Sequence, residues 1–319
     1  MRPHTAFRPK PLMPFLNIPL LRHTLRLAAR SGVRRVWINA WHRAEQVVEF
    51  IATNPEPALE VTVVVEDELL GTAGGLANLW PRMEREPVLL LLSDIVADFD
   101  LPSMSRFHGE ARRMRGACAT MALTSAADPA QYGAVHVDEA QLLTDIAGLR
   151  SGRSPGAADG AGFVNASAHI FEPEFMDRLP REPSCFVRQG YIPAMDDGLS
   201  CAGWMHQGAW FDTGTPAALL AAQEAALAGD LPVDDALFAL GGRRHGPRGY
   251  VHESADVAGD ARLEAGTTIA QGCVIGAGVR LSRCLVMPDT CIEPGTEADN
   301  VILGGVPQPA GVPLSEVRS

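Results

Sequence analysis

The sequence predicts an α/β fold with a mixed, mostly parallel sheet, followed by a short parallel β-helix. Two patterns carry this prediction. Between residues 18 and 150, helical stretches alternate with short β-branched apolar runs, which is typical of strands joined by crossover helices. From Val251 onward, aliphatic residues recur at every sixth position, which is the period of a hexapeptide-repeat β-helix.

Four apolar runs predict the strands of the first part of the chain. These runs cover residues 33–40, 59–67, 87–94 and 117–125. Their near-continuous hydrophobicity predicts burial on both faces, as in an open, mostly parallel sheet. Such a sheet binds ligands at the carboxyl ends of its strands.

Capping residues predict two of the helices. The stretch 20–31 places leucines near one face and stops at Gly32. Thr215 is a natural N-cap for a second helix, with Pro216 in its first turn and Gly229 at its end. We expect an α/β domain over residues 1–230, with a loop at 148–162, where Gly, Ser and Ala dominate.

The aliphatic repeat predicts the second domain. Its six consecutive members are Val251, Val257, Leu263, Ile269, Ile275 and Leu281. The repeat then slips, and Leu285, Ile292 and Ile302 indicate roughly one further, irregular coil. A β-sandwich would instead show period-two alternation. We therefore expect a linker at 231–247, a β-helix at 248–306 and a tail at 307–319.

Composition excludes several classes of function. The formal charge of −11 over 319 residues, without a basic cluster, argues against nucleic acid as a partner. No apolar stretch approaches the length of a membrane span, and the six cysteines form no CxxC pair. We expect a cytoplasmic protein in which a few local cations, a metal ion or helix N-termini receive any anionic substrate.

Two aspartates are candidates for metal binding. Asp94 ends the apolar run 87–94, at the sheet edge where active sites form, although it could also cap the next turn. Asp212 precedes the helix that follows Thr215, where a local turn role is equally open. Two carboxylates brought together at this edge could hold Mg²⁺, which prefers oxygen ligands and substrate phosphates.

Three further features admit both a structural and a functional interpretation. The small residues in 69–75 follow a strand and precede a helix predicted to begin near Leu76, where a base or phosphate could approach the backbone. A connection that needs positive φ would explain Gly74 and Gly75 equally well. Lys10 lies between two prolines, and Asn165 could be a turn residue or a sugar contact.

Taken together, these residues resemble the nucleotide-sugar pyrophosphorylases, also called sugar-1-phosphate nucleotidyltransferases. Family features appear in order along nearly the whole chain: RPKPLMPFLNIPLL, ELLGTAGG, LLLLSD, QYGAV, FVNA and WFDTGTPAALL. The β-helix tail is similar to that of the mannose-1-phosphate guanylyltransferase branch. The resemblance implies a Rossmann-like fold that lacks its first strand and a left-handed β-helix.

The resemblance also implies a role for each matching residue. Asp94 and Asp212 would be Mg²⁺ ligands, and Lys10 would contact phosphate. The base would lie against Leu70, Gly71, Thr72, Ala73 and Gly74, and the sugar would meet Gly133 and Asn165. The implied reaction joins a nucleoside triphosphate and a sugar 1-phosphate into an NDP-sugar, with GDP-mannose or a related GDP-sugar expected, and releases pyrophosphate. A homo-oligomer assembled through the β-helix is a further expectation.

Two departures from the family pattern qualify this expectation. The family opens with an apolar strand and a GxGTRLRP loop that cradles the triphosphate, whereas residues 1–3 fall where that loop ends. The family's Glu-Lys-Pro is also missing, and Arg150 or Arg153 could replace its lysine, although a guanidinium is not equivalent to an ammonium. We expect a start codon assigned too far downstream, with a catalytically silent nucleotide-sugar-binding homologue as the alternative. Under either explanation, the 319 residues alone should be weakly active.

Overall fold

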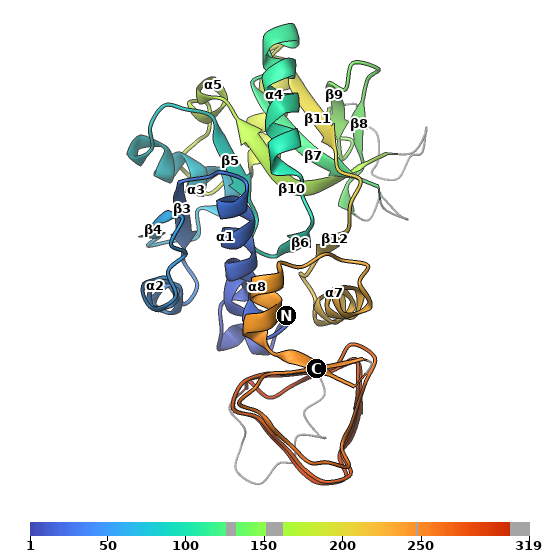
Figure 1. Cartoon of the computed structure of the whole chain (residues 1–319). Helices are drawn as coiled ribbons and strands as arrows, with labels where there is room; N and C mark the ends of the chain where they lie inside the picture. Colours follow the sequence, from blue (N-terminus) through green and yellow to red (C-terminus); the bar gives the residue numbers. More distant parts are fainter. Residues whose placement is uncertain (126–131, 151–161, 247, 307–319) are drawn as a thin grey trace.

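The computed structural model describes residues 1–125, 132–150, 162–246 and 248–306. An α/β body contains the first part of the chain, and a separate stack of short strands lies against its lower end (Figure 1). We call residues 249–303 the C-terminal segment. The predicted loop at 148–162 and the tail at 307–319 lie largely or wholly outside the described residues.

Two sheets form the centre of the body. In one, β3 (Arg35–Ala40) and β4 (Glu60–Val65) pair in parallel. The other has the order β11-β7-β10-β5, with β5 (Val88–Leu91), β7 (Ala119–Thr124), β10 (Val164–Phe171) and β11 (Cys201–Met205). In this sheet β10 is antiparallel to β5 and β7, whereas β11 is parallel to β7. All four predicted strands are present, and the sheet architecture is mixed as expected.

The body also contains helices, the last two of which lie between the sheets and the stack of short strands (Figure 1). They are α1 (Leu20–Arg30), α2 (Ala44–Thr53), α3 (Gly71–Leu79), α4 (Leu101–Arg115), α5 (Pro173–Met176), α6 (Ile192–Asp196), α7 (Pro216–Ala228) and α8 (Asp235–Gly241). The two predicted caps of α7 are confirmed: the Thr215 hydroxyl accepts the Ala218 N–H at 3.2 Å, and Gly229 is left-handed with φ of 94°.

One predicted helix boundary was wrong. Helix α3 begins at Gly71, five residues before the expected start near Leu76. The glycines that indicated a loop lie inside the helix instead. They are glycines because neighbouring backbone approaches them too closely for a side chain. A Cβ on Gly74 would lie 2.6 Å from the Glu182 carbonyl oxygen.

The expectation that all four apolar strands are buried on both faces was also wrong. Strand β7 is fully buried, whereas the four residues of β5 are only partly buried and β3 is largely half-exposed. The physical reason is sheet pairing: β7 has a hydrogen-bonded neighbour on each side, whereas β3 pairs only with β4 and β5 only with β10 among the described strands. The apolar composition of a strand does not show whether another strand pairs with its second edge.

Three smaller pairs complete the body. They are β1 (Pro14–Phe15) with β2 (Ile18–Pro19), β6 (Ile95–Ala97) with β12 (Trp210–Asp212), and β8 (Val135–Val137) with β9 (Leu143–Ile146). All three are antiparallel. The β6–β12 pair matters most here, because it places Asp212 opposite Ile95 and therefore next to Asp94.

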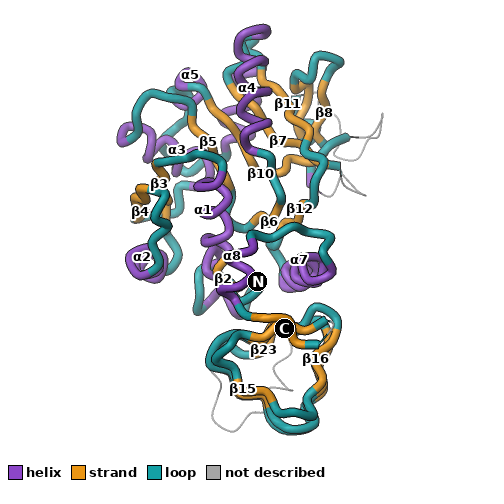
Figure 2. The backbone as a smooth tube through the Cα atoms, in the orientation of Figure 1, coloured by secondary structure: helices purple, strands orange, loops and turns teal. Residues whose placement is uncertain are grey.

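The C-terminal segment consists of three parallel sheets in which each strand pairs with the third strand after it. They are β14 (Gly249–Val251), β17 (Thr268–Ile269), β20 (Leu285–Val286) and β23 (Ile302–Leu303); β15 (Asp256–Val257), β18 (Val274–Ile275) and β21 (Cys291–Ile292); and β16 (Arg262–Glu264), β19 (Arg280–Ser282) and β22 (Glu297–Asp299). Figure 2 shows them on three sides of a closed outline. Five of the six repeat positions are buried, and Val257 packs against them. This arrangement is compatible with the predicted β-helix.

The segment is fixed to the body through a shared core and buried hydrogen bonds. Residues 231–247 include α8 and β13 (Arg243–His245), which pairs with β14. Phe15 and Leu220 of the body share one apolar cluster with Tyr250 and Met287 of the segment. The side-chain oxygen of Gln223, in α7, accepts hydrogen bonds from the Leu16 N–H at 3.2 Å and from the Thr268 hydroxyl at 3.1 Å.

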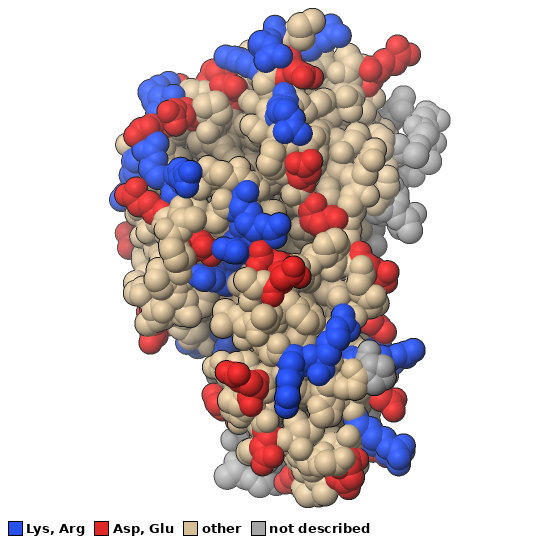
Figure 3. Space-filling view, viewed as in Figure 1, with Lys and Arg blue, Asp and Glu red and all other residues tan. Residues whose placement is uncertain are grey.

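The visible surface shows no large area of one charge. Acidic and basic side chains are interspersed on the face in Figure 3. Within the described residues, no helix combines the length and apolar character that crossing a membrane requires.

The buried amide of Gln223 gives a stability prediction. Replacing Gln223 with Ala should lower the free energy of unfolding by about 1–3 kcal/mol, because the buried Leu16 N–H loses its acceptor. Urea unfolding checks this, with Glu224→Ala at the exposed neighbouring position of α7 as the control. If both substitutions lowered the free energy of unfolding equally, the stabilising role of the Gln223 hydrogen bonds would be contradicted.

A buried histidine predicts acid sensitivity. Desolvation lowers the pKa of His169 from 6.5 to about 3, so this ring is neutral in the folded state. Below pH 6.5 this histidine is protonated in the unfolded chain but stays neutral in the folded chain. The free energy of unfolding should therefore fall by about 2 kcal/mol between pH 7 and pH 5 because of His169. His169→Phe should flatten that slope in urea unfolding, whereas His245→Gln at an exposed site should not.

Candidate active site

The three predicted catalytic residues meet at one place in the structure. Lys10 begins a short 3-10 turn, Lys10–Leu12, and its ammonium forms an ion pair with the Asp94 carboxylate. Both side chains are about 30% exposed, at 30% and 29%. Strand β5 ends at Leu91, so Asp94 lies beyond its carboxyl end and directly before β6 rather than inside the strand as expected, and Asp212 is the last residue of β12.

Backbone contacts hold the two aspartates side by side. The carbonyl oxygen of Asp94 accepts the Thr213 N–H at 3.0 Å and the Thr213 hydroxyl at 2.7 Å. One oxygen of the Asp212 carboxylate accepts the Gly214 N–H at 2.8 Å. Its second oxygen accepts no hydrogen bond from a described residue.

Gly214 is a site residue that sequence reasoning missed. A Cβ at this position would lie 2.9 Å from the Asp212 carboxylate and 3.5 Å from the Lys10 nitrogen. A side chain at position 214 would therefore require the Asp212 carboxylate to shift. The Thr-Gly-Thr sequence after Asp212 was the available signal, but it was interpreted only as the start of a helix.

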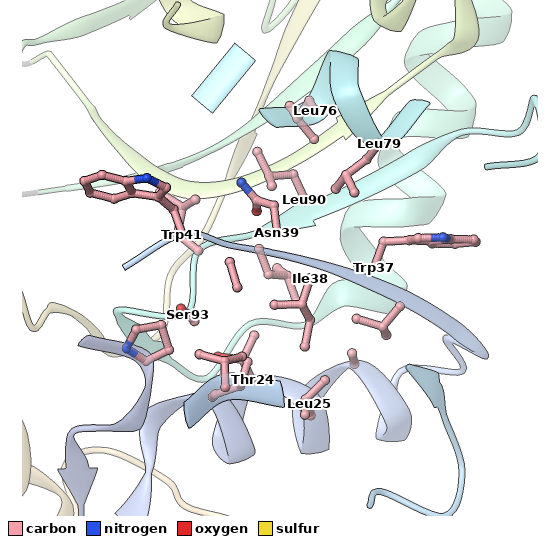
Figure 4. Close-up of a pocket in the computed structure, with 18 of the residues that line it drawn as sticks. Thr24, Leu25, Trp37, Ile38, Asn39, Trp41, Leu76, Leu79, Leu90 and Ser93 are labelled. Atoms are coloured by element: carbon pink, nitrogen blue, oxygen red, sulfur yellow. The ribbon is translucent and has the colours of Figure 1, made fainter. Parts of the chain in front are cut away.

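The predicted base-binding residues form the first turn of α3. Leu70 precedes this helix, Gly71 and Thr72 begin it, and Ala73 and Gly74 are fully or nearly fully buried. Part of this turn is already occupied by the chain, because the Ala73 N–H donates to the Ser184 carbonyl at 3.0 Å. Leu69 and Leu76, which flank this turn in the sequence, line a cavity, which Figure 4 shows with Leu76 labelled.

The glycines of this turn have two different structural causes. Gly71 has a φ of 69°, and a Cβ there would lie 2.6 Å from the Ser184 carbonyl oxygen. Positive φ does not explain Gly74 and Gly75, because neither has it, so that structural alternative was wrong. A Cβ on Gly75 would instead meet the side chain of Asn39 at 2.6 Å and that of Glu66 at 2.9 Å.

The two predicted sugar contacts are next in sequence to residues that contact Trp210. Gly133 follows Tyr132, whose ring contacts the Trp210 ring edge-on with centroids 5.7 Å apart. The Trp210 indole N–H donates to the Ala166 carbonyl at 3.0 Å, next to Asn165. Trp210 is two residues before Asp212 in β12, so these contacts link both segments to the strand that carries Asp212.

Asn165 also has a local role. Its side-chain oxygen accepts the Ser167 N–H at 2.8 Å within an irregularity of the β7–β10 ladder, where Ser167 has a φ of 65°. The side-chain oxygen is thereby occupied, whereas the NH₂ group donates to no described residue. The turn interpretation and the sugar interpretation are therefore compatible.

Arg150, considered as a replacement for the missing lysine, is bound to α6. Its guanidinium donates to the Asp196 carboxylate at 3.0 Å and to the Met195 carbonyl at 3.2 Å. A substrate phosphate would have to displace these acceptors. Arg153 lies outside the described residues.

The donor set fits Mg²⁺ bound jointly with a substrate. Asp94 and Asp212 offer carboxylate oxygens, and among the described residues no group of three or more His, Cys, Asp and Glu side chains could hold a metal ion. Magnesium is commonly bound by one or two carboxylates together with substrate phosphates and water. Two adjacent carboxylates agree with that mode of binding rather than with a closed protein cage.

Comparisons with known proteins agree with this fold and site. Residues 1–229 match the family described as "Nucleotidyl transferase". The chain therefore belongs to the nucleotidyl transferase family, which confirms the resemblance to the nucleotide-sugar pyrophosphorylases.

Curated relatives cover most of the chain. A mannose-1-phosphate guanylyltransferase of Mycobacterium tuberculosis is 27% identical over 297 residues, covering 92% of this chain and 78% of the relative. The probable mannose-1-phosphate guanylyltransferase 3 of Oryza sativa subsp. japonica is 27% identical over 308 residues, covering 95% and 82%.

Solved structures share the fold. A putative glucose-1-phosphate thymidylyltransferase from Bacillus anthracis, in complex with a sucrose, has a TM-score of 0.60 and 18% identity, covering 73% of this chain and 92% of that one. HddC from Yersinia pseudotuberculosis, complexed with GMP-PN, has a TM-score of 0.55 and 18% identity, covering 67% and 88%.

The packing at Gly214 gives a site prediction. Gly214→Ala should displace the Asp212 carboxylate and weaken Mg²⁺-dependent nucleotide binding about ten-fold or more, with little change in global stability. Titration of a fluorescent nucleotide with and without Mg²⁺ measures this. Gly259→Ala is the control, because a Cβ there meets no atom within 4 Å. Unchanged Mg²⁺-dependent affinity in Gly214→Ala would refute the assignment.

Proposed function

We propose that the protein transfers a nucleotidyl group from a nucleoside triphosphate to a sugar 1-phosphate. GTP and mannose 1-phosphate, giving GDP-mannose or a related GDP-sugar, are the substrates that the names of the curated relatives favour. The observation that carries the proposal is the assembly of Lys10, Asp94 and Asp212 at the carboxyl end of β5.

The reaction needs positioning more than acid–base chemistry. A phosphate oxygen of the sugar 1-phosphate attacks the α-phosphorus, the bond from that phosphorus to the bridging oxygen breaks, and pyrophosphate leaves with the electron pair. The nucleophile is already anionic, so no strong base is required. Catalysis then depends on alignment and on neutralising charge at the phosphates.

Each site residue has a definable task in this scheme. The Lys10 ammonium, held beside Asp94, can move from the carboxylate to a phosphate oxygen without leaving the site. Asp94 and Asp212 would hold Mg²⁺, which neutralises charge on the phosphate oxygens when it is bound. Gly214 keeps the Asp212 carboxylate oriented and permits its close approach to Lys10.

The substrate positions follow from the same geometry. The base would lie against the turn Leu70–Gly74 on the side of Leu69 and Leu76, away from the Ser184 backbone. The sugar would meet the backbone at Gly133 and the NH₂ group of Asn165, near Trp210. In this arrangement the sugar phosphate and the triphosphate would meet at the two aspartates.

We further propose that residues 248–306 form a left-handed β-helix that serves as an assembly surface. Three parallel sheets and the buried six-residue repeat support the β-helix. Light scattering of the chain with and without residues 246–319 tests the oligomer. Composition supports a cytoplasmic location.

A second candidate function is binding of a nucleotide sugar without catalysis. The observation that favours it is the incomplete pairing of β5, whose carboxyl end carries Asp94. A site on an incompletely paired strand could bind product yet align the reacting phosphates poorly. Binding of GDP-mannose with no release of pyrophosphate under any substrate combination would select this alternative.

Substitution of the aspartates tests the proposed reaction. The rate of pyrophosphate release from GTP and mannose 1-phosphate with Mg²⁺ should fall on the order of 100-fold or more in Asp94→Asn and in Asp212→Asn. Each substitution removes one charged ligand of the metal ion. Asp256→Asn, at an exposed position of the C-terminal segment, should retain full activity. EDTA should abolish the activity and Mg²⁺ should restore it.

The same assay with ATP, CTP and UTP, and with glucose 1-phosphate, compares the substrates. Full activity of Asp94→Asn and Asp212→Asn would refute the metal assignment. Higher activity with another nucleotide or sugar would refute the guanylyl or mannosyl assignment and leave the reaction class intact.

A further inference from the structure

Strands β1 and β2 form a hairpin whose tip consists of Leu16 and Asn17. Phe15 pairs with Ile18, so only these two residues make the turn. Both have positive φ, 49° at Leu16 and 63° at Asn17, as a type I′ turn requires. Asparagine adopts this conformation readily, whereas leucine rarely does. Contacts from the rest of the fold must therefore hold Leu16 in place.

The tip of this hairpin is held by three elements that come much later in the sequence. The Asn17 NH₂ group donates to the Gly241 carbonyl in α8 at 3.0 Å and to the Ile269 carbonyl in β17 at 2.8 Å. The Leu16 N–H donates to the Gln223 side-chain oxygen in α7 at 3.2 Å. We call Gln223, Gly241 and Ile269 the socket. Leu16 is completely buried there, and the C-terminal segment contributes to the socket through β17.

The socket fits the hairpin closely and fixes the orientation of the Asn17 side chain. A Cβ on Gly241 would lie 2.2 Å from the Leu16 carbonyl oxygen, so the backbone of the tip approaches α8 closely. Two carbonyl oxygens accept from the Asn17 amide, and only its NH₂ group can donate to both. Asn17→Asp would keep the shape of the side chain but place a charged oxygen against these carbonyls. Asn17 is therefore required as a donor as well as a turn residue.

A run of backbone hydrogen bonds connects this hairpin to Lys10. The Met13 N–H donates to the Lys10 carbonyl at 3.0 Å, and the Met13 carbonyl accepts the Leu20 N–H at 3.0 Å, just after β2. Met13 and Phe15 are both completely buried, within the core that the body shares with the C-terminal segment. Close-packed interiors transmit displacements because they contain few voids. A shift of the tip should therefore move the turn that carries Lys10.

We propose that Asn17 is a positioning residue, through which the C-terminal segment sets the place of the Lys10 ammonium. With the tip in the socket, the Lys10 turn is held where its ammonium pairs with Asp94, close to Gly214. Without the two hydrogen bonds of Asn17, the turn loses this alignment. The inference rests on the proposed function for the substrate of the site, whereas the position of Lys10 can be measured without any substrate.

The backbone conformation at the tip points to a role beyond stability. Leu16 has a positive φ that is unfavourable for a leucine. Such residues persist only where the surrounding structure over-determines them, and they cluster at functional sites. Only Met13 separates the hairpin from the turn Lys10–Leu12. The strained tip and the candidate active-site lysine therefore belong to one compact stretch of chain.

Lys10 can be followed chemically because it is the only lysine in the sequence. N-acetoxysuccinimide transfers its acetyl group to an amine, with loss of N-hydroxysuccinimide and a proton. Mass spectrometry of peptides separates acetylation of Lys10 from acetylation of the N-terminus. In the folded chain the Asp94 carboxylate engages the Lys10 ammonium, whose side chain is 30% exposed. Release from this ion pair should raise the rate of acetylation about three-fold, which is the scale of a partly exposed ion pair.

Asn17→Asp in the full chain is the first test. We expect acetylation of Lys10 to become about three-fold faster, because the tip leaves the socket and the Lys10 turn shifts. With GTP, mannose 1-phosphate and Mg²⁺, kcat for pyrophosphate release should fall about ten-fold or more and KM should change less, since misalignment acts on the reacting geometry. Asn300→Asp is the matched control and should change neither quantity. Asn300 is exposed, lies in the C-terminal segment and also has a positive φ, of 52°.

Gly241→Ala reaches the tip from the other side of the contact. Its Cβ would meet the Leu16 carbonyl oxygen, so this variant should displace the tip with Asn17 intact and give the same two changes. Gly109→Ala in α4 is its control, because a Cβ there meets no atom within 4 Å.

A third variant separates lost stability from lost position. Ile292 is buried in β21, in a sheet of the C-terminal segment that contributes nothing to the socket. Ile292→Ala should lower the melting temperature, because it leaves a cavity in the core of that segment. It should change neither the acetylation rate of Lys10 nor kcat at temperatures where the chain is folded.

Two results would overturn the proposal. One is a lower melting temperature in Asn17→Asp with the acetylation rate of Lys10 and kcat unchanged, which would make the contact purely structural. The other is the same change of acetylation rate and kcat in Ile292→Ala as in Asn17→Asp. If circular dichroism shows that Asn17→Asp does not fold, Asn17→Gly decides, because glycine keeps positive φ at the tip but has no side-chain donor.

The two readouts separate this inference from the proposed function. Acetylation rates in the expected order without any release of pyrophosphate would refute the proposed function alone. Pyrophosphate release that is the same in the unsubstituted chain and in Asn17→Asp, with equal acetylation rates of Lys10, would refute the positioning role alone.

Discussion

The antiparallel contact between residues 94–97 and 210–213 is the interaction on which the candidate site depends. It joins the end of one central strand to the start of α7, across more than a hundred residues of sequence. The Asp94 carbonyl accepts two hydrogen bonds from Thr213, so the backbone around both aspartates is held by the same contact. The carboxylates can then change partners between Lys10 and a ligand while their backbone positions stay fixed.

The same contact links the site to the C-terminal segment. Helix α7 begins three residues after Thr213 and carries Gln223, whose buried side chain bonds both the N-terminal turn at Leu16 and the C-terminal segment at Thr268. The segment that contains Lys10 is thereby packed between the body and the C-terminal segment. The turn that follows Lys10 shares an apolar core with the C-terminal segment through Met13, Phe15 and Leu16.

The incomplete pairing of β3 and β5 sets a second constraint. Strand β5 has a paired neighbour on one edge only among the described strands, and its residues are partly exposed although they are apolar. Its carboxyl end carries Asp94, so the least enclosed strand of the four-stranded sheet is also the one that presents a candidate metal ligand.

The sequence alone determined the elements and the chemistry of the site, because both follow from local patterns. Apolar runs and caps specified strands, α1 and α7, the six-residue repeat specified the buried positions of the C-terminal segment, and ordered motifs specified Lys10, Asp94 and Asp212. Tertiary structure decided what depends on contacts between distant residues. The early start of α3, the need for glycine at position 214 and the open edges of β3 and β5 arise from backbone that packs from elsewhere in the chain, and no local pattern encodes a neighbour that is absent.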